Sequence, residues 1–317
     1  MTNYQTHLPV LFHEVMEMLP ASLSMPNRIP SRYLDLTFGG GGHAIEMLNR
    51  YPHLMADLVD QDEEALQAGQ EKIQNLGLQS RVKWHHHNFA HVVESMAQEN
   101  DDLFDMILAD IGVSSHHFDS GQRGFSFREE APLDMRMDLR GDVTAADIVN
   151  QYPEKELVRI FQEFGDEPFA LRLAEKIVET RRKTPFRTTK ELETLCFYTY
   201  PKALRHQSRH PATRVFQALR IEVNQELVVL EKSLKHAVKL LKPGGRLAII
   251  TFHSLEDRIV KHFFQSLNST YKNKTEDSEE ILYKMISKKP IIPTDSEIAL
   301  NKRARSAKMR ILELLGK

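Results

Sequence analysis

Cysteine is almost absent from this chain, and long apolar runs are missing altogether. The single cysteine, Cys196, cannot form an internal disulfide or a thiolate cluster, which excludes structural zinc sites of the multi-cysteine kind and fits a reducing compartment. The longest apolar runs, Leu8 to Phe12 and Leu247 to Phe252, fall far short of the ~20 residues that a membrane span requires. The first residues lack the basic region and cleavage site of a secretion signal. We therefore expect a cytoplasmic protein without membrane contact.

Net charge is also nearly absent, because 42 Lys and Arg face 44 Asp and Glu. The total by itself points to no polyanionic partner, but the charges are unevenly distributed. Ile177 to Arg220 holds ten basic and three acidic side chains, and Ala299 to Lys317 holds six and one. Conversely, His91 to Asp119 holds seven acids and no Lys or Arg. A single charge run is usually a solvated face, but two basic segments in one neutral chain favour a phosphate-bearing partner.

The first third of the chain alternates strand-like and helix-like stretches. Short apolar runs indicate strands, and apolar residues three and four positions apart indicate helices. Continuous apolar strands separated by helices predict a parallel sheet covered on both faces, which is an α/β fold. The expected strands are Arg32 to Phe38, one ending near Val59, Val82 to His86 and Phe104 to Ile111, with Asp62 as the N-cap of a helix over Glu63 to Asn75 and a further helix around Ala90 to Ala97.

The alternation stops after the fourth strand. Ala145 to Leu204 has the spacing of several helices, and the pattern from Pro211 to Leu241 indicates one long helix. After a turn at Lys242 to Gly245, strand character resumes at Arg246 to Phe252, and Ser306 to Leu314 is expected as a last edge strand. The helices therefore form an insertion between the fourth and fifth strands.

Four consecutive glycines, Gly39 to Gly42, follow the first strand. Glycine lets the backbone turn sharply and lets a ligand approach, and the next helix presents free N–H groups, so a nucleotide-like ligand is indicated. With Asp60 about 20 residues further on, the loop also satisfies a dinucleotide fingerprint, and NAD stays formally open. A glycine-rich turn without any ligand is the simpler alternative.

Charge separates the two cofactors. S-adenosylmethionine carries a sulfonium and an ammonium group and gains from carboxylates, whereas a dinucleotide pyrophosphate is repelled by them. Asp35 lies near the end of the first expected strand and Asp110 near the end of the fourth, so both would lie at the carboxyl edge of the sheet, where ligands bind. The sequence therefore favours S-adenosylmethionine, although Thr37 stands where a glycine is usual.

Eight distinctive stretches run through nearly the whole chain in one order. They are His7 to Leu11 (HLPVL), Thr37 to His43 (TFGGGGH), Ile111 to Ser115 (IGVSS), Arg123 to Phe127 (RGFSF), Pro132 to Asp138 (PLDMRMD), Arg209 to Glu226 (RHPATRVFQALRIEVNQE), Phe252 to Lys261 (FHSLEDRIVK) and Arg303 to Arg310 (RARSAKMR). With them the chain resembles the ribosomal RNA small subunit methyltransferase H family, which methylates N4 of a decoding-centre cytidine in 16S rRNA. The resemblance implies a Rossmann-like domain that binds S-adenosylmethionine over residues 1–118 and 213–317, and an inserted all-helical substrate-binding domain over residues 119–212.

The resemblance also implies a donor site, position by position. Ile111 stands where leucine is usual, which is a mild change, and His117 stands where a glutamine is more familiar. The implied contacts are Gly41, Gly42 and His43 to the methionine part, Asp60 to the ribose and Phe89 to the adenine, with Asp110 and His117 completing the pocket.

The target amine has requirements of its own. The N4 lone pair of cytosine is delocalised into the ring, so the site must accept the amine's N–H bonds and hold the nitrogen in line with the methyl group at roughly 3 to 3.5 Å. Asp110 is the expected catalytic residue. Many amino-methyltransferases carry Asp/Asn-Pro-Pro-aromatic at this point, but this chain reads Asp-Ile-Gly-Val from Asp110. The aromatic that stacks on the base must come from elsewhere, and the candidates are Phe118, Phe125 and Phe127.

Other chemistry-bearing residues have simpler explanations. Methylation at cytosine C5 would need a thiolate, but Cys196 lies in an apolar helical setting typical of an inert, buried cysteine. His85 to His87 cannot converge on one ion from a strand, because successive side chains point to opposite faces, so no metal is expected. The charged side chains of Asp134 to Asp138 either pair with one another or act near the base. His253 to Asp257 either line the nucleotide pocket or cap a helix.

The expected partner is small-subunit rRNA, in an assembled or assembling 30S subunit. The target base would be extruded into a cleft between the sheet edge and the inserted domain, while basic side chains grip phosphates. Two rivals remain, a methyltransferase for a protein amine or a ribose hydroxyl, and an RNA-binding module without turnover. The sequence leaves open whether the chain acts alone or as a homodimer. The expected phosphate contacts are Arg181, Arg182, Lys183, Arg205, Arg209, Arg214, Arg303 and Arg305.

Overall fold

The computed structural model describes residues 9–17, 19–20, 31–99, 103–112, 123–269 and 282–316. The chain divides into two compact units, of which the first comprises Met1–Gly112 and Leu227–Lys317 and the second comprises Val113–Glu226. The expected insertion, residues 119–212, ends earlier than the second unit does. Helix α10 (Ala212–Asn224) lies beyond that expected end, and its apolar face packs into the core of the second unit.

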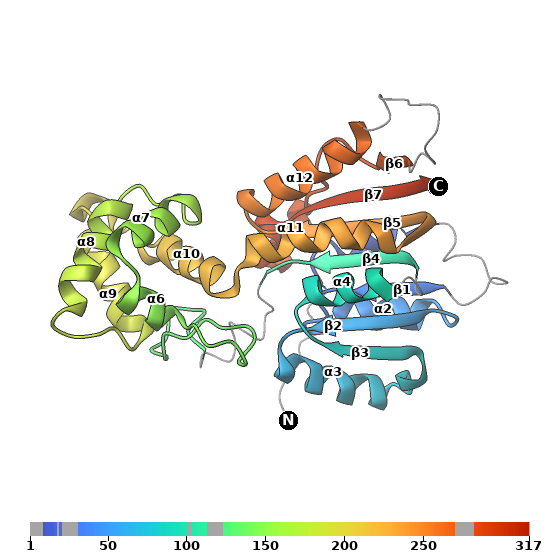
Figure 1. Ribbon diagram of the computed structural model, residues 1–317, viewed down its shortest axis with the longest axis horizontal. Helices are drawn as coiled ribbons and strands as arrows, with labels where there is room; N and C mark the ends of the chain where they lie inside the picture. Colours follow the sequence, from blue (N-terminus) through green and yellow to red (C-terminus); the bar gives the residue numbers. More distant parts are fainter. Residues whose placement is uncertain are drawn as a thin grey trace. The chain divides into compact units, whose positions relative to one another are not determined.

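The first unit is built on a seven-stranded sheet in the order β3-β2-β1-β4-β5-β7-β6 (Figure 1). The strand pairs among β1 to β5 are parallel, whereas β7 runs antiparallel to both β5 and β6. The prediction of a parallel sheet is confirmed, but the last strand is not at the edge, because a strand that the sequence pattern did not reveal, β6, pairs with its outer side. The strands are β1 (Arg32–Asp35), β2 (Met55–Asp60), β3 (Val82–His86), β4 (Phe104–Asp110), β5 (Leu241–Thr251), β6 (Leu282–Met285) and β7 (Lys308–Gly316).

Helices cover both faces of this sheet, as the continuous apolar strands predicted. Neighbouring side chains of one strand enter different cores: Tyr33 packs with α2 and α3, and Leu34 packs with α4, α11 and α12. Asp62 is the N-cap of α3 as expected, since its side chain accepts a hydrogen bond from the Glu64 backbone N–H. The helices of this unit are α1 (Phe12–Glu17), α2 (Gly42–Arg50), α3 (Glu63–Asn75), α4 (Phe89–Glu99), α11 (Glu226–Ala237), α12 (Ser254–Ser269) and α13 (Asp295–Leu300).

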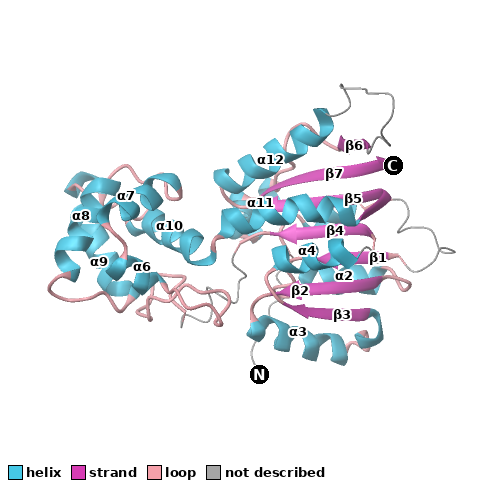
Figure 2. Cartoon of the chain, viewed as in Figure 1, coloured by secondary structure: helices cyan, strands magenta, loops and turns pink. Residues whose placement is uncertain are grey.

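The second unit is helical in its described part (Figure 2). Amphipathic helices enclose their own core, in which Leu157, Ile160 and Phe161 are fully buried, as their three- and four-residue spacing predicted. Capping boxes start α6 at Thr144 and α9 at Thr188. Besides α10, its helices are α6 (Ala145–Gln151), α7 (Glu154–Glu163), α8 (Ala170–Arg181) and α9 (Thr189–Thr199).

The long helix expected from Pro211 to Leu241 is in fact broken. Gln225 adopts a left-handed conformation with φ of 48°, so α10 ends before it and α11 begins after it. Asn224 fixes the position of the break. Its side chain donates to the Met135 carbonyl at 2.8 Å and accepts from the Met137 N–H at 2.8 Å. Helical periodicity continues across this position, so the sequence pattern alone did not reveal the break. Across the described residues, no helix is long and apolar enough to span a membrane.

Candidate functional site

The glycine turn connects β1 to α2 and depends on two left-handed residues. Gly39 has φ of 53° and Gly41 has φ of 78°, conformations that other residues adopt only with strain. A Cβ atom on Gly41 would lie 2.5 Å from the Phe38 ring, and one on Gly42 would lie 3.0 Å from Pro9. Gly40, by contrast, has open space around its Cα. The turn therefore presents bare backbone at the N-terminus of α2, as a cradle for a ligand requires.

Three predicted acids are brought to one edge of the sheet. Asp35 pairs with Leu58 and Leu108 of the two neighbouring parallel strands, so the ends of those strands, Asp60 and Asp110, lie beside it. This confirms the expectation that Asp35 and Asp110 lie at one edge of the sheet, and Asp60 at the end of β2 joins them. The three acids nevertheless have different environments and different tasks.

Asp35 is buried, and its carboxylate holds the neighbouring backbone in place and does not face a ligand. It is 2% exposed, and its carboxylate accepts hydrogen bonds from the Tyr33 hydroxyl at 2.9 Å and from the Thr37 N–H at 3.1 Å. Burial raises the pKa of Asp35 to about 6, although both hydrogen bonds oppose the shift. The sequence argument treated Asp35 as a direct partner for a cation, whereas its contacts hold the start of the glycine turn.

Asp60 fixes the turn to the following helix. One oxygen accepts the Gly39 N–H at 2.7 Å and the other accepts the Asp62 N–H at 2.9 Å. The residue remains partly exposed at the edge of the sheet. Since each carboxylate oxygen has two lone pairs, Asp60 can brace the turn and still accept a hydroxyl group.

Asp110 is the most perturbed acid of the site. Its Oδ1 is buried and has no hydrogen-bond partner among the described residues, while the side chain as a whole is 25% exposed. Burial, reinforced by the nearby charges of Asp35 and Glu256, raises the pKa of Asp110 to about 8. The Asp110 backbone N–H donates to the Thr37 hydroxyl at 2.7 Å. An unpartnered buried carboxyl is costly, and an incoming cation would offset that cost.

His43 faces Asp110 across a short gap, with its Nδ1 4.0 Å from the Asp110 Oδ2. Its Nε2 lies 3.1 Å from the Val10 carbonyl, which can only accept, so Nε2 carries the proton and Nδ1 is left as an acceptor. Burial lowers the pKa of His43 to about 4. The ring is therefore neutral near pH 7, and it adds no positive charge to compete with a cationic ligand.

Phe89, the predicted adenine contact, begins α4 and is partly exposed at the same edge. Its neighbour Asn88 caps that helix by accepting the Ala90 N–H, and it also donates to the Gln61 side chain at 3.0 Å. Asn88 thus links the start of α4, where Phe89 lies, to Gln61, the residue after Asp60. His117 and Phe118 lie outside the described residues.

The segment after β5 caps a helix. Glu256 is fully buried, and its Oε2 accepts from the backbone N–H groups of Phe252 at 2.8 Å and His253 at 3.2 Å. Asp257 pairs with Arg310 at 2.6 Å. Of the two alternatives for His253 to Asp257, the structure shows the helix cap, while Glu256 also acts on the site through its effect on Asp110.

Sequence reasoning missed the roles of two residues that shape this site, Tyr33 and Thr37, and it named Glu256 only as part of the segment His253 to Asp257. Thr37 was noted only as a departure from glycine, yet its hydroxyl accepts the Asp110 N–H. A hydroxyl residue in a glycine loop next to a buried strand was the available signal. Tyr33 acts through Asp35, two residues along the same strand. Glu256 acts on Asp110, which only the tertiary fold brings near.

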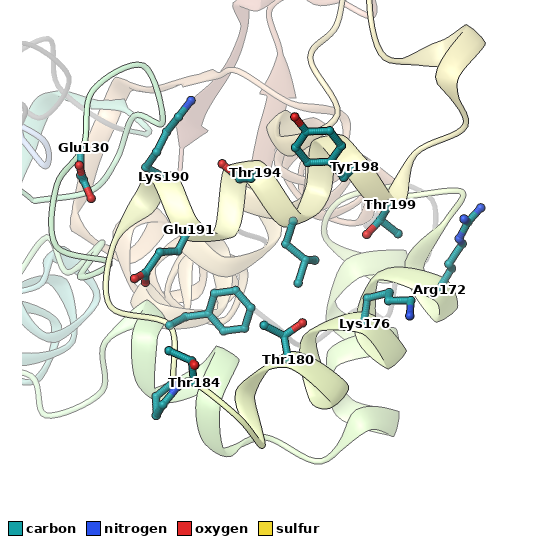
Figure 3. A pocket seen from close by; sticks show the side chains of 13 residues that line it. Glu130, Arg172, Lys176, Thr180, Thr184, Lys190, Glu191, Thr194, Tyr198 and Thr199 are labelled. Atoms are coloured by element: carbon teal, nitrogen blue, oxygen red, sulfur yellow. The ribbon is translucent and has the colours of Figure 1, made fainter.

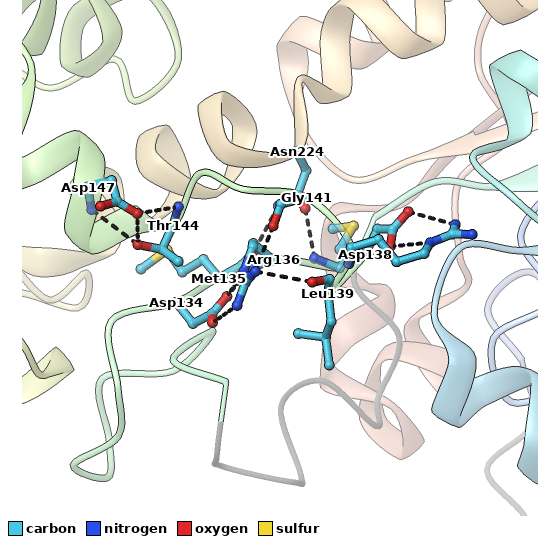
Figure 4. A network of polar contacts seen from close by, with 11 residues as sticks. Asp134, Met135, Arg136, Asp138, Leu139, Gly141, Thr144, Asp147 and Asn224 are labelled. Atoms are coloured by element: carbon cyan, nitrogen blue, oxygen red, sulfur yellow. Dashed lines mark hydrogen bonds and ion pairs between the residues drawn. The ribbon is translucent and has the colours of Figure 1, made fainter.

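In the second unit, the loop from Asp134 to Gly141 braces itself (Figure 4). The Arg136 guanidinium donates to both oxygens of Asp134, at 2.8 and 2.7 Å, and to the carbonyls of Leu139 and Gly141. Asp138 pairs with Arg140. The charges of this loop therefore pair locally, which was one of the two alternatives, and Met135 within it is held at φ of 63°.

The predicted phosphate contacts fall into three groups. Arg181 donates to the carbonyls of Val149 and Tyr152, and Arg205 donates to those of Tyr198 and Tyr200, so both cap helix C-termini. Arg214 is half-buried, with a buried Nε that has no partner among the described residues. Exposed side chains that can reach a phosphate are Arg182, Lys183, Arg209, Arg303 and Arg305.

The histidine run and the cysteine behave as expected. His85 pairs with Asp57 at 2.8 Å, and His87 packs against His91, so the three residues of the run do not converge. Cys196 is fully buried in the second core. Burial raises the pKa of its thiol far above the usual range, which removes it as a nucleophile.

Comparison with known proteins gives one consistent result. The model of the MraW methylase family matches residues 4–315. A protein of Picosynechococcus named ribosomal RNA small subunit methyltransferase H is 48% identical over 282 residues, which cover 89% of each chain. Proteins of the same name from Nostoc and from Carboxydothermus hydrogenoformans are 47% and 43% identical; the first match covers 97% of this chain and 92% of that protein, and the second covers 98% of both.

Proposed function

The chain belongs to the MraW methylase family, and on that basis we propose that it uses S-adenosylmethionine to methylate the N4 amine of a decoding-centre cytidine in 16S rRNA. Relatives at 43 to 48% identity carry the name of a small-subunit rRNA methyltransferase, which supports methylation of small-subunit rRNA as the activity. The observation that carries the proposal is the Asp110 carboxyl group. It ends β4 beside the glycine turn with one oxygen buried and unpartnered among the described residues.

The residues present fit a cationic donor. The turn offers backbone without Cβ atoms, Asp60 places a carboxylate at the sheet edge where it can meet ribose hydroxyls, and Asp110 offers a carboxylate for the positive charges. We assign Gly41, Gly42 and His43 to the methionine part, Asp60 to the ribose and Phe89 to the adenine, with Asp110 and His117 completing the pocket. The bound donor supplies a methyl carbon that its sulfonium makes electrophilic.

The protein's own contribution is orientation. An ionised Asp110 can accept an N–H bond of the target amine and hold the nitrogen lone pair toward the methyl carbon. Such positioning can lower a barrier by about 7 to 11 kcal/mol, whereas a general base typically contributes about 10² to 10⁴ in rate. We therefore propose Asp110 as the catalytic residue mainly because of where it holds the amine. A neutral His43 beside it keeps the local potential negative.

Binding of rRNA would use the exposed basic side chains, Arg182, Lys183, Arg209, Arg303 and Arg305. Phosphate contacts from such side chains give an affinity that falls steeply with salt. Arg181 and Arg205 are better assigned to holding the helical unit together, because their guanidinium groups already donate to backbone carbonyls. Phe125 is buried and Phe127 stacks on His210, so neither ring is freely available to a base.

The decisive experiment identifies the product. The full chain is incubated with methyl-labelled donor and either 30S subunits or protein-free 16S rRNA, and the digested RNA is analysed by mass spectrometry. We expect N4-methylated cytidine with the wild type and none with Asp110→Ala, while Glu46→Gln on the exposed face of α2 stays active. Label on C5, on a ribose or on a protein would refute the assigned target. Donor binding without any transfer would favour the RNA-binding module.

A further inference from the structure

A groove in the helical unit is unrelated to the predicted donor site. It lies between α8 and α9, has a volume of about 640 Å³, and is closed at one end by the loop that joins the two helices (Figure 3). Its position follows from helical spacing: Arg172, Lys176 and Thr180 are four residues apart and share one face of α8. All its lining residues belong to the second unit.

The floor of the groove is apolar and its lips are polar. Phe186 is 4% exposed and, like Leu195, packs against the core of the unit, while the exposed Pro185 adds to the apolar lining. Along α9, Figure 3 shows Lys190, Thr194 and Tyr198 on the outer side of the helix, again at four-residue spacing, while Glu191 and Thr199 point toward α8. A flat apolar ligand with polar edges would match this groove, because its floor is apolar and its rim carries hydroxyl groups.

An exposed aromatic ring stands at the open end. Tyr198 is 65% exposed, which is unusual for a large ring, and the Arg205 guanidinium lies 5.3 Å from its centroid. Phe197 meets the ring edge-on at an interplanar angle of 89°. A ring that contacts a cation and still exposes most of its surface to solvent offers a face on which a nucleic-acid base can stack.

Charge is distributed unevenly along the groove. Arg172 and Lys176 line the end near Tyr198, while the other end holds both charged glutamates, Glu130 and Glu191, with Lys190 beside them (Figure 3). Lys176 pairs with the exposed Glu179, and water screens a surface pair of this kind, so a phosphate can compete for the ammonium group. An acidic peptide would carry negative charge along its whole length and meet the two glutamates. A nucleotide carries its charge at one end only.

We propose that this groove holds one unpaired nucleotide of the RNA substrate, with its phosphate at Arg172 and Lys176 and its base stacked on Tyr198 at the open end. The inference rests on the proposed function, because it takes RNA as the substrate. It adds a contact away from the reacting base, which would fix the register of the bound strand. Binding energy from such a remote contact positions the substrate without taking part in methyl transfer.

The test compares variants of the full chain in binding to protein-free 16S rRNA and to 30S subunits, each at several salt concentrations. Tyr198→Ala should weaken binding about 5- to 100-fold, the usual effect of losing one stacked base, whereas Tyr198→Phe keeps the ring and should bind as the wild type does. Arg172→Ala should lower the salt slope by about 0.7, and Lys155→Ala, an exposed lysine on α7 away from the groove, serves as the charge-matched control. Donor affinity and the transfer rate at saturating RNA should not change.

Several outcomes would overturn the proposal. Unchanged RNA affinity in Tyr198→Ala, with wild-type donor binding as evidence of folding, would remove the stacked base. Weakened binding to 30S subunits but not to protein-free rRNA would mean that the groove holds a ribosomal protein instead. If the wild type bound RNA through Tyr198 but never transferred a methyl group, the proposed activity would fail while the nucleotide site stood.

Discussion

Binding of the cationic donor is expected to release a proton from Asp110. In the donor-free protein, burial raises the pKa of this carboxyl to about 8, so near pH 7 it is mostly protonated and cannot offset a positive charge. A donor that requires the carboxylate must first ionise it. Donor affinity should therefore rise with pH up to the pKa of about 8.

The size of the effect follows from that pKa. At about two pH units below it, ionising Asp110 costs about 2.7 kcal/mol, which corresponds to donor affinity roughly 100-fold weaker than the limiting value. Burial raises the pKa of Asp35 only to about 6 and lowers that of His43 to about 4, so neither group changes its charge much between about pH 7 and pH 8. The donor's own amino group titrates near about 7.7 to 8.0 and acts in the opposite direction, losing its charge as pH rises.

Calorimetry in two buffers of different ionisation enthalpy measures the proton directly. Near pH 7 the wild type should release about 0.9 proton per donor bound, and Asp110→Asn, which has the same shape but cannot titrate, should release almost none. The difference between the two proteins cancels the donor's own titration. Wild-type affinity that changes less than about threefold between pH 6 and pH 8, with no proton released, would refute the assigned charge partner.

The same pKa shift has a consequence for stability. Because the folded-state pKa of Asp110 lies above the ordinary value of 3.8, the folded protein binds more protons than the unfolded chain, and stability falls as pH rises from about 4 to about 8. Without donor, Asp110→Asn should therefore be more stable than the wild type at alkaline pH, by about 1 to 3 kcal/mol for a partly hydrated group. Equal melting temperatures of the two proteins there would contradict an unpartnered carboxyl.

Three further predictions concern the glycine turn, the buried cysteine and the basic side chains of the helical unit. Gly41→Ala should destabilise the protein by about 1 to 3 kcal/mol and weaken donor binding, because φ is positive and the Cβ collides, whereas Gly40→Ala should fold normally; thermal melts and calorimetry check both. Cys196→Ser should keep most of the methyl-transfer rate, and a well-folded but inactive variant would reopen C5 chemistry. Arg182→Ala should lower the salt slope of RNA binding, whereas Arg181→Ala should lower the unfolding midpoint; the reverse pattern would undo the division between phosphate contacts and helix caps.

Much of the fold was predictable because its signals are local. The strand at Val82 to His86 and the helix with its cap at Asp62 follow from apolar runs, spacing and one capping side chain, all within a few neighbouring residues. The meeting of Asp35, Asp60 and Asp110 was also predictable, since parallel strands end at a common edge. These features need no knowledge of distant contacts.

The sequence by itself determined that a glycine turn and acidic strand ends share one sheet edge, and that a helical insertion divides the chain. Only the tertiary structure decided what each group does there. Asp35 is buried and hydrogen-bonded, the Oδ1 of Asp110 is buried without a partner among the described residues, and Gln225 breaks a helix whose periodicity continues. Burial sets the pKa of the two carboxyl groups, and Asn224 reaches Met135 and Met137, far away in the sequence, at the helix break. Local sequence patterns encode neither the burial nor these distant contacts.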